Sequence, residues 1–211
     1  MTTPLHRLLV TLDDVEPPVQ RDLVVPSGLP LDRLHRVLQA AMGWEDSHLH
    51  QFVIGAGPDA TRYGIPDQEW ADFGMPIQPE SRATVAQLAP TPGSRFTYIY
   101  DYGDDWRHTV EVIALLQAPT LPEDGGEGIH CISAHGACPP EDCGGPPGYE
   151  NLREALANPK HPEHRPTKDW LGRPFDPDSV DLDAINTALA QLFKPRRSAP
   201  AKRARGARRR S

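Results

Sequence analysis

Residues 98–112 read "YIYDYGDDWRHTVEV", and this stretch decides how the middle of the chain folds. Aromatic and β-branched residues, which favour strands, stand on both sides of the turn-forming segment "YGDD". We therefore predict a central hairpin with strands Phe96–Asp101 and Trp106–Leu115. On the second strand, alternation places Trp106 and His108 on the same apolar face, with His108 at the edge of the core.

The turn of this hairpin is also a candidate site. Asp101, Asp104 and Asp105 fall within five residues. Turn chemistry accounts for the glycine and one aspartate, whereas three neighbouring carboxylates repel one another without helping the turn. Two interpretations stay open: an acidic turn, or a site for a polar ligand or a divalent cation such as Mg²⁺ or Mn²⁺, with Trp106 and His108 as neighbours. Carboxylates this close also raise one another's pKa, as acid–base catalysis requires.

The segment before the hairpin predicts a strand–strand–helix–strand unit. Strands are expected at "LHRLLVTLDD" (5–14), "VQRDLVVP" (19–26) and "HLHQFVIG" (48–55), and a helix at "LPLDRLHRVLQAAMGW" (29–44). Pro30 suits the first helical position and Gly43 the C-terminal cap. The helix carries one apolar stripe, made of Leu31, Leu34, Leu38, Ala41 and Met42. This order indicates an α+β fold with antiparallel sheet, and a β-grasp-like arrangement is one way to pack it.

The remaining segments are predicted as loops and helices. Residues 55–83 indicate a long surface excursion, and "TVAQLAP" (84–90) a short helix or turn. Residues 117–150 contain seven glycines and six prolines, so mostly loop is expected there. Loops this long are usually functional or held by something. Helices are expected over 149–159, 167–172 and 181–193, the last with Asp181 as its N-cap.

The cysteines suggest a second candidate metal site. Three cysteines within the glycine-rich loop, together with the histidines of "HPEH", could hold a structural zinc ion. The candidate ligands are Cys131, Cys138, Cys143, His161 and His164. Their spacing lacks the paired CxxC of well-attested zinc sites, so buried, unreactive thiols remain the alternative. An odd cysteine count without a secretion signal speaks against a disulfide framework.

The loop segment "CPPEDCGG" (138–145) is the third feature of interest. Glu141 and Asp142 would join the hairpin carboxylates if the loop folds over the hairpin. Gly144 and Gly145 would let the loop approach another backbone closely. The flanking prolines lack the N–H groups that a phosphate-binding loop needs, which argues against phosphate binding.

Charge divides the chain into two parts. The net charge is −7, yet nine of the 22 Lys and Arg residues lie in 194–211, where there is no acid. Residues 1–193 therefore hold 13 basic against 29 acidic residues, a net charge of −16. We expect a single α+β domain over 1–193 and a disordered basic tail over 194–211. The tail residues expected to contact nucleic acid are Arg196, Arg197, Lys202, Arg203, Arg205, Arg208, Arg209 and Arg210. The alternative is a tail that folds back on the acidic body.

The sequence predicts neither a membrane span nor a signal peptide. No apolar run approaches the roughly 20 residues that a spanning helix needs. The N-terminus "MTTPLHRLLVTLDD" lacks the apolar region of a signal peptide. We therefore expect a cytoplasmic protein of one domain.

Four uncommon sequence motifs follow one another along the chain. These are "GWEDSHLHQF" (43–52), residues 98–112, "CISAHGACPPEDCGGPPGYENLREALANPKHPEH" (131–164) and "DWLG" (169–172). With them, the chain resembles the Ri-plasmid ORF-three-like family from about residue 4 to 193. Members are often labelled TnpR-like passenger proteins of transposable elements. The resemblance implies an uncharacterised protein associated with plasmids or mobile elements.

The residues themselves argue against resolvase activity. A serine resolvase needs a nucleophilic serine on an N-terminal strand, an arginine cluster and a helix-turn-helix. Here Ser27 stands beside Gly28 in an expected loop with few arginines nearby. Two hypotheses remain: a non-enzymatic accessory protein that meets a protein partner through its body and nucleic acid through its tail, or a metal-dependent enzyme built on Asp101, Asp104 and Asp105 with His108.

Overall fold

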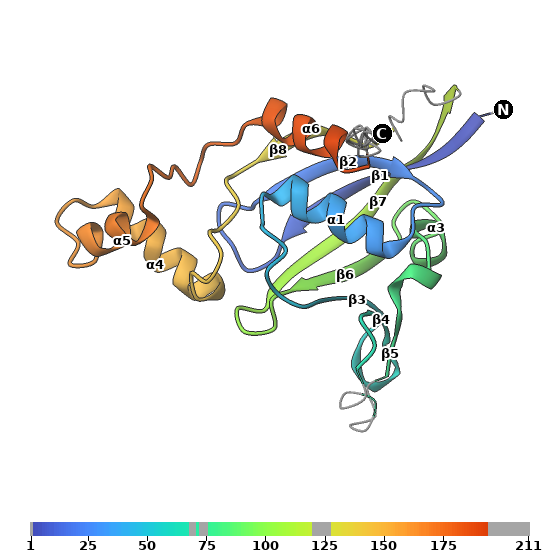
Figure 1. Ribbon diagram of the computed structural model, residues 1–211, viewed down its shortest axis with the longest axis horizontal. Coiled ribbons are helices and arrows are strands. Elements are labelled where there is room, and N and C mark those ends of the chain that lie inside the picture. Colours follow the sequence, from blue (N-terminus) through green and yellow to red (C-terminus); the bar gives the residue numbers. More distant parts are fainter. Residues whose placement is uncertain (1, 68–70, 72–75, 120–127, 194–211) are drawn as a thin grey trace, which may run out of the picture.

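The computed structural model describes residues 2–67, 71, 76–119 and 128–193, and its α+β class is the predicted one (Figure 1). In this part of the chain eight strands form one sheet in the order β5-β4-β3-β6-β7-β1-β2-β8. Neighbouring strands are antiparallel except β4 and β5, which are parallel. The strands are β1 Thr2–Leu12, β2 Gln20–Pro26, β3 His50–Ile54, β4 Thr61–Gly64, β5 Ile77–Pro79, β6 Arg95–Tyr100, β7 Trp106–Pro119 and β8 His130–His135.

The central hairpin is confirmed. Strands β6 and β7 pair from Arg95 and Glu111 to Tyr100 and Trp106, with the acidic turn between them. Strand β7 continues beyond the predicted end, because its far half pairs with β1 rather than with β6. The hairpin therefore separates β3 from β1 and β2, so the first three strands do not form a local sheet of their own.

Helices cover the sheet unevenly. They are α1 Leu31–Met42, α3 Val85–Leu88, α4 Gly145–Ala157, α5 His164–Leu171 and α6 Leu182–Gln191, with 3₁₀ turns η1 Gly57–Asp59 and η2 Glu80–Arg82. Helix α1 lies across the sheet and contacts α6, which also contacts β8 (Figure 1). Helices α4 and α5 lie together at one end of the molecule, and α5 buries none of its residues.

Helix α1 behaves as its periodicity predicts. All five residues of the apolar stripe are buried. The helix begins one residue later than expected, with Pro30 as the N-cap, and it ends at Gly43 with φ of 104°. The Gly43 N–H group donates to the Gln39 carbonyl, a left-handed cap that glycine adopts without steric cost. The buried stripe meets aromatic side chains of β3, β6 and β7, including Phe52, Tyr98 and Trp106.

Two loop predictions were partly wrong. Within 117–150, strand β8 pairs with β2 because β2 otherwise leaves a free edge, and the glycines and prolines lie outside "HCISAH". Helix α4 begins at Gly145, four residues before Tyr149, because Pro146 and Pro147 occupy a first turn that needs no N–H donor. The excursion at 55–83 contains β4 and β5. Helix α5 begins at His164, three residues earlier than expected.

Two further expectations concern the ends of the chain and membranes. The basic tail, 194–211, lies outside the described residues. Among the helices that the structure describes, none has the length and apolar content to cross a bilayer.

Candidate functional site

Three segments that are distant in sequence meet at the β6–β7 turn. They are residues 44–48 after α1, the turn 101–105, and the loop 139–144. The Trp44 indole N–H donates to the Pro139 carbonyl at 3.1 Å, and the Glu45 N–H donates to Glu141 Oε1 at 2.9 Å. The Asp101 N–H donates to the Leu49 carbonyl at 2.9 Å. These bonds fix the segments relative to one another.

One histidine and three carboxylates converge where the segments meet. The Nε2 atom of His48 lies 3.2 Å from Asp142 Oδ1, 3.6 Å from Asp101 Oδ2 and 3.7 Å from Glu141 Oε2. One imidazole N–H cannot donate to three carboxylates, and the two longer distances exceed hydrogen-bond length. The three carboxylates are therefore close together, and one imidazole does not fully compensate their negative charge. The Asp101 side chain is 9% exposed and that of Asp142 is 74% exposed, so the cluster is buried on one side and open to solvent on the other.

Glu141 has one hydrogen-bonded carboxylate oxygen and one buried oxygen without a hydrogen bond. Its Oε1 atom accepts from the Glu45 N–H and from the Tyr100 hydroxyl at 3.0 Å. Burial raises the pKa of Tyr100 above its ordinary value, which keeps the phenol protonated as a donor. The Oε2 atom of Glu141 is buried and has no hydrogen-bond partner among the described residues. Burying a carboxylate oxygen without a hydrogen-bond partner is unfavourable, and a cation bound to Oε2 would offset this cost.

Local backbone conformation aims two of the carboxylates. Asp101 and Asp142 both have φ of 56°, in the left-handed region that aspartate tolerates better than most residues. Asp101 Oδ1 accepts from the Gly103 N–H at 2.9 Å, which locks the side chain against its own turn. This leaves Asp101 Oδ2 facing His48.

The other two aspartates of the turn have different partners. Asp104 Oδ2 accepts from the Gly144 N–H at 3.1 Å and so joins the hairpin to the loop. Asp105 forms an ion pair with Arg107 at 2.9 Å. The structure thus brings together Asp101, Glu141 and Asp142, whereas Asp104 and Asp105 lie outside the cluster.

Trp106 and His108 are core residues. Both are fully buried, so the expectation that His108 lies at the edge of the core was wrong. The Trp44 ring packs edge-on against His108 at 5.2 Å between centroids, and His108 Nδ1 lies 3.1 Å from the Tyr98 carbonyl oxygen. Burial lowers the pKa of His108 to about 4, so this imidazole is neutral at neutral pH. Strand periodicity correctly places the His108 side chain on the apolar face. It does not show that the segment after α1 covers this side chain.

The proposed cysteine–histidine zinc site does not assemble. Among the described residues, the only group of three or more candidate ligands within metal-binding reach is His48, Asp101 and Asp142. Within the described part of the chain, no three of the predicted ligands Cys131, Cys138, Cys143, His161 and His164 come within that reach. Cys131 is buried on β8, while His164 Nδ1 lies 2.8 Å from the Ala155 carbonyl oxygen in the α4–α5 hairpin. Burial raises the pKa of Cys143 to about 12 and raises the pKa of Cys138 well above its ordinary value, as expected of unreactive thiols.

Comparisons with known proteins assign the chain to a family. Residues 4–184 match the sequence pattern of plasmid pRiA4b ORF-3-like proteins. The chain belongs to the plasmid pRiA4b ORF-3-like family. The resemblance noted from the sequence is thereby confirmed.

Its similar proteins carry no assigned activity. This ORF-3-like chain is 42% identical to the uncharacterized protein y4hQ of Sinorhizobium fredii over 211 residues, the full length of both. It is also similar to the crystal structure of the protein of unknown function MM3350 from Methanosarcina mazei Go1. That match has a TM-score of 0.73 and 28% identity, and it covers 87% of this chain and 98% of the other. Function must therefore be inferred from the site itself.

Sequence reasoning missed two residues of the ORF-3-like site, His48 and Tyr100. His48 lies in "EDSHLH", where a histidine between acidic residues and a strand is a weak signal of a ligand. Tyr100 was assigned only to a strand, because nothing local shows that its hydroxyl reaches Glu141 in another segment. Both residues join the site only through tertiary contacts.

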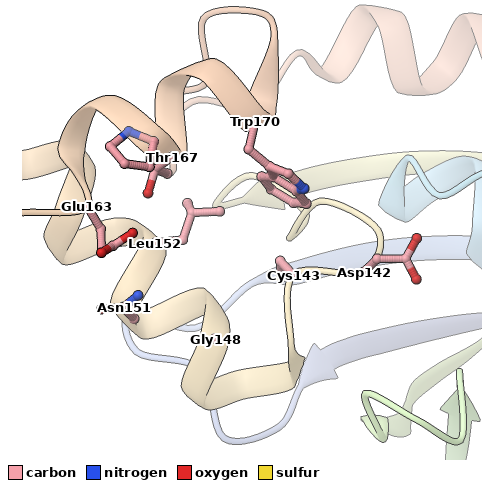
Figure 2. Close-up of a pocket in the computed structure, with 9 residues that line it drawn as sticks. Asp142, Cys143, Gly148, Asn151, Leu152, Glu163, Thr167 and Trp170 are labelled. Atoms are coloured by element: carbon pink, nitrogen blue, oxygen red, sulfur yellow. The ribbon is translucent and has the colours of Figure 1, made fainter.

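A cavity of about 250 Å³ adjoins the cluster between α4, α5 and residues 142–143. Figure 2 shows the Trp170 indole beside Cys143, with Leu152 on the α4 side and Thr167 and Glu163 farther along. The Asp142 carboxylate points away from this cavity (Figure 2). The cavity and the carboxylate cluster therefore lie on either side of the same loop segment.

Proposed function

We propose that this ORF-3-like protein binds a divalent metal ion at His48, Asp101 and Asp142, with Glu141 as a further oxygen ligand. The observation that carries the proposal is the convergence of three carboxylates on one imidazole nitrogen, with the buried Glu141 Oε2 left without a hydrogen bond. A cation would neutralise this charge and satisfy Glu141 at once.

The distances suit a metal ion. Two ligands that each lie about 2.1 Å from a metal are separated by roughly 3.0–3.5 Å in tetrahedral or octahedral geometry. The three distances from His48 Nε2 run from 3.2 to 3.7 Å. The ligand atoms of His48, Asp101 and Asp142 all lie within 4.8 Å of one another, so side-chain rotations that shorten the longer separations would complete the geometry. Turn chemistry holds Asp101, and the hydrogen bonds to Glu141 Oε1 hold the opposite wall.

The ligand types narrow the choice of metal. Carboxylates alone suit Mg²⁺ and Ca²⁺, whereas an imidazole nitrogen favours Zn²⁺ and other transition metals. One imidazole with three carboxylates therefore favours Mn²⁺ or Zn²⁺ over Mg²⁺. Because the ligands come from three segments, the ion would also hold the loop 139–144 against the hairpin.

A catalytic role is the second candidate for the same site. The Asp142 side chain is 74% exposed, so a bound ion keeps coordination positions open to solvent. Open positions distinguish catalytic metal sites from closed structural ones. The sequence suggested a metal-dependent enzyme with His108 beside the aspartates. In the catalytic role proposed here, His48 is the histidine of the site.

Calorimetric titration of full-length, EDTA-stripped protein with Mn²⁺ and Zn²⁺ tests the proposal. We expect binding of one ion, and we expect the double variant Asp101→Asn with Asp142→Asn to weaken it at least about 100-fold. The control is Asp105→Asn, which removes one carboxylate charge from the hairpin turn outside the cluster. Equal binding by the double variant and the control would refute the metal site, provided that circular dichroism shows both folded.

We also propose that residues 1–193 act as one acidic unit and that the basic tail, 194–211, supplies any affinity for nucleic acid. Nine basic residues and no acid support this role, because neutralising phosphates releases counterions. The body is unsuited to phosphates, since segments 44–48, 101–105 and 139–144 contain seven acids and no Lys or Arg.

A further inference from the structure

The cavity beside the proposed metal site has walls of mixed chemistry. It lies between α4, α5 and residues 142–143, and its walls combine an aromatic ring with aliphatic and polar groups. The Trp170 side chain is 53% exposed although α5 is an ordered helix in the structure. A half-exposed indole at the mouth of a cavity is an available surface for a flat, positively charged group.

The walls provide for an alkyl stem as well as a charge. Leu152 and Pro166 both line the cavity. Figure 2 shows Leu152 between Trp170 and Glu163. Lysine and arginine side chains bury their methylene stems on apolar surface while their charged ends contact aromatic or acidic groups. The arrangement of an indole, an apolar wall and a carboxylate suits such a side chain.

The electrostatic surroundings favour a cation over an anion. Of the nine lining residues, Asp142 and Glu163 are acidic, and none is lysine, arginine or histidine. The acidic lining therefore favours a cation, although the Asp142 carboxylate points away from the cavity (Figure 2).

We infer that this cavity binds an arginine side chain, and that its occupant is the basic tail, 194–211, of the same chain. Arginine fits better than lysine because its planar guanidinium stacks on an indole. Seven of the nine basic residues in the tail are arginines. The body carries a net charge of −16 and the tail +9, so the two parts are complementary in charge.

Covalent attachment favours the tail over a separate partner. The tail leaves the body after α6, whereas α4 and α5 lie at the other end of the molecule (Figure 1). Eighteen residues span up to about 60 Å when extended, more than the roughly 40 Å diameter of a compact body of 193 residues. A tethered ligand reaches an effective concentration of the order of millimolar, so even a weak arginine site is occupied in cis. The inference does not depend on metal binding, since its test leaves His48, Asp101 and Asp142 unchanged.

The test uses a full-length chain whose nine basic tail residues are replaced by glutamine, called the tail-neutral chain. The replaced residues are Lys194, Arg196, Arg197, Lys202, Arg203, Arg205, Arg208, Arg209 and Arg210. A fluorescently labelled peptide with the sequence of residues 194–211 is titrated with each protein at about 50 mM salt, and anisotropy reports binding. We expect the tail-neutral chain to bind the peptide at least about fivefold more tightly than the native chain, whose own tail competes.

Substitutions in the cavity locate the contact. In the tail-neutral chain, Trp170→Ala should weaken peptide binding about fivefold and Glu163→Gln about twofold, while Trp170→Phe keeps most of the affinity. The charge-matched control is Asp169→Asn on the same helix, because Asp169 is 76% exposed and does not line the cavity. A peptide with lysine in place of arginine should bind more weakly.

Two results would overturn the inference. Unchanged affinity in folded Trp170→Ala protein would show that the peptide binds elsewhere on the acidic body. Equal peptide affinity for the native and tail-neutral chains would show that the tail does not occupy the cavity in cis. Thermal unfolding of each variant establishes that it is folded.

Discussion

His108 lies in the core, with its Nδ1 atom facing a backbone carbonyl, whereas His48 faces three carboxylates at the surface. The two imidazoles have the same chemistry and opposite surroundings. Burial removes water from His108 and disfavours its charged form. The His48 side chain is 28% exposed and lies next to carboxylates, so a cation from solvent can reach its ring nitrogen. At the scale of the residue, solvent access separates a packing histidine from a candidate ligand.

The buried His108 predicts a loss of stability in mild acid. Its pKa is about 4 when folded and about 6.5 when unfolded, so the unfolded chain takes up a proton first as the pH falls. Stability that depends on neutral His108 is complete above about pH 6.5 and is lost progressively toward pH 4. Between pH 7 and pH 5 the expected loss is about 2 kcal/mol.

Urea unfolding at pH 7 and pH 5 checks this prediction. The variant His108→Met keeps an apolar side chain of similar size and should lack that part of the pH dependence. His6 and His35, whose pKa values burial also lowers, are present in both proteins and cancel in the comparison. The same pH dependence in parent and variant would contradict the assignment.

At the scale of the element, helix α1 and the loop 139–144 position the site from two sides. Helix α1 ends at Gly43, and the chain leaves it directly into Trp44 and the segment that holds His48. The loop approaches the hairpin so closely that a Cβ atom on Gly145 would lie 2.6 Å from the Asp104 carbonyl oxygen. Gly145 also has φ of 68°. A packed helix and a glycine contact thus fix both walls of the cluster.

Truncating the buried stripe of α1 should destabilise the protein strongly. Leu38 is 1% exposed, so Leu38→Ala is expected to lower the free energy of unfolding by about 2–5 kcal/mol. The matched control is Leu115→Ala on β7, where the leucine is 47% exposed and the expected loss is below about 1 kcal/mol. Chemical denaturation measures both. Similar losses at the two positions would show that the stripe has been assigned wrongly.

The glycine contact predicts a local effect with a functional consequence. Gly145→Ala should cost about 1–3 kcal/mol, because alanine disfavours the positive φ and its Cβ meets backbone. Since the loop carries Glu141 and Asp142, Gly145→Ala should also lower the affinity for the metal ion. Gly28→Ala is the control, as Gly28 has open space for a Cβ and no positive φ. A harmless Gly145→Ala would mean that loop and hairpin are not in close contact.

At the scale of the whole molecule, charge is the dominant feature. An acidic body and a basic tail belong to one chain, and the acids concentrate where the three segments of the site meet. This distribution favours cations at the body, either a metal ion or an arginine side chain. We expect any contact with phosphates to be made by the tail. The same tail would then be shared between nucleic acid and the cavity beside α5.

Nucleic-acid binding should therefore depend on the tail and on salt. We expect truncation after Phe193 to abolish binding of duplex DNA or single-stranded RNA, measured by anisotropy. In the full chain, the log–log slope of affinity against salt should be roughly −0.7 to −0.9 per phosphate neutralised. A truncated body that is folded and binds as well as the full chain would exclude the tail as the nucleic-acid contact.

Local sequence patterns by themselves determine several elements of this fold. The hairpin at 95–119, the stripe of α1 with its Gly43 cap, and the Asp181 N-cap of α6, which accepts from the Ala184 N–H, follow from turn chemistry, periodicity and capping. Each depends on residues within about four positions of one another along a helix, or on one turn between two strands. Asp101, Glu141 and Asp142 were also candidates from sequence, because acids beside turns are conspicuous.

Tertiary structure alone decided which of the candidates meet. His48 joins Asp101 and Asp142 because β3 pairs with β6 and the loop 139–144 folds onto the hairpin turn. The same packing places Trp44 over His108 and disperses the cysteines, and the free edge of β2 recruits β8. These contacts join residues tens of positions apart, and their free energy depends on which surfaces remain to be buried once the whole sheet has formed. Periodicity assigns a side chain to a face, whereas only the complete fold determines what that face contacts.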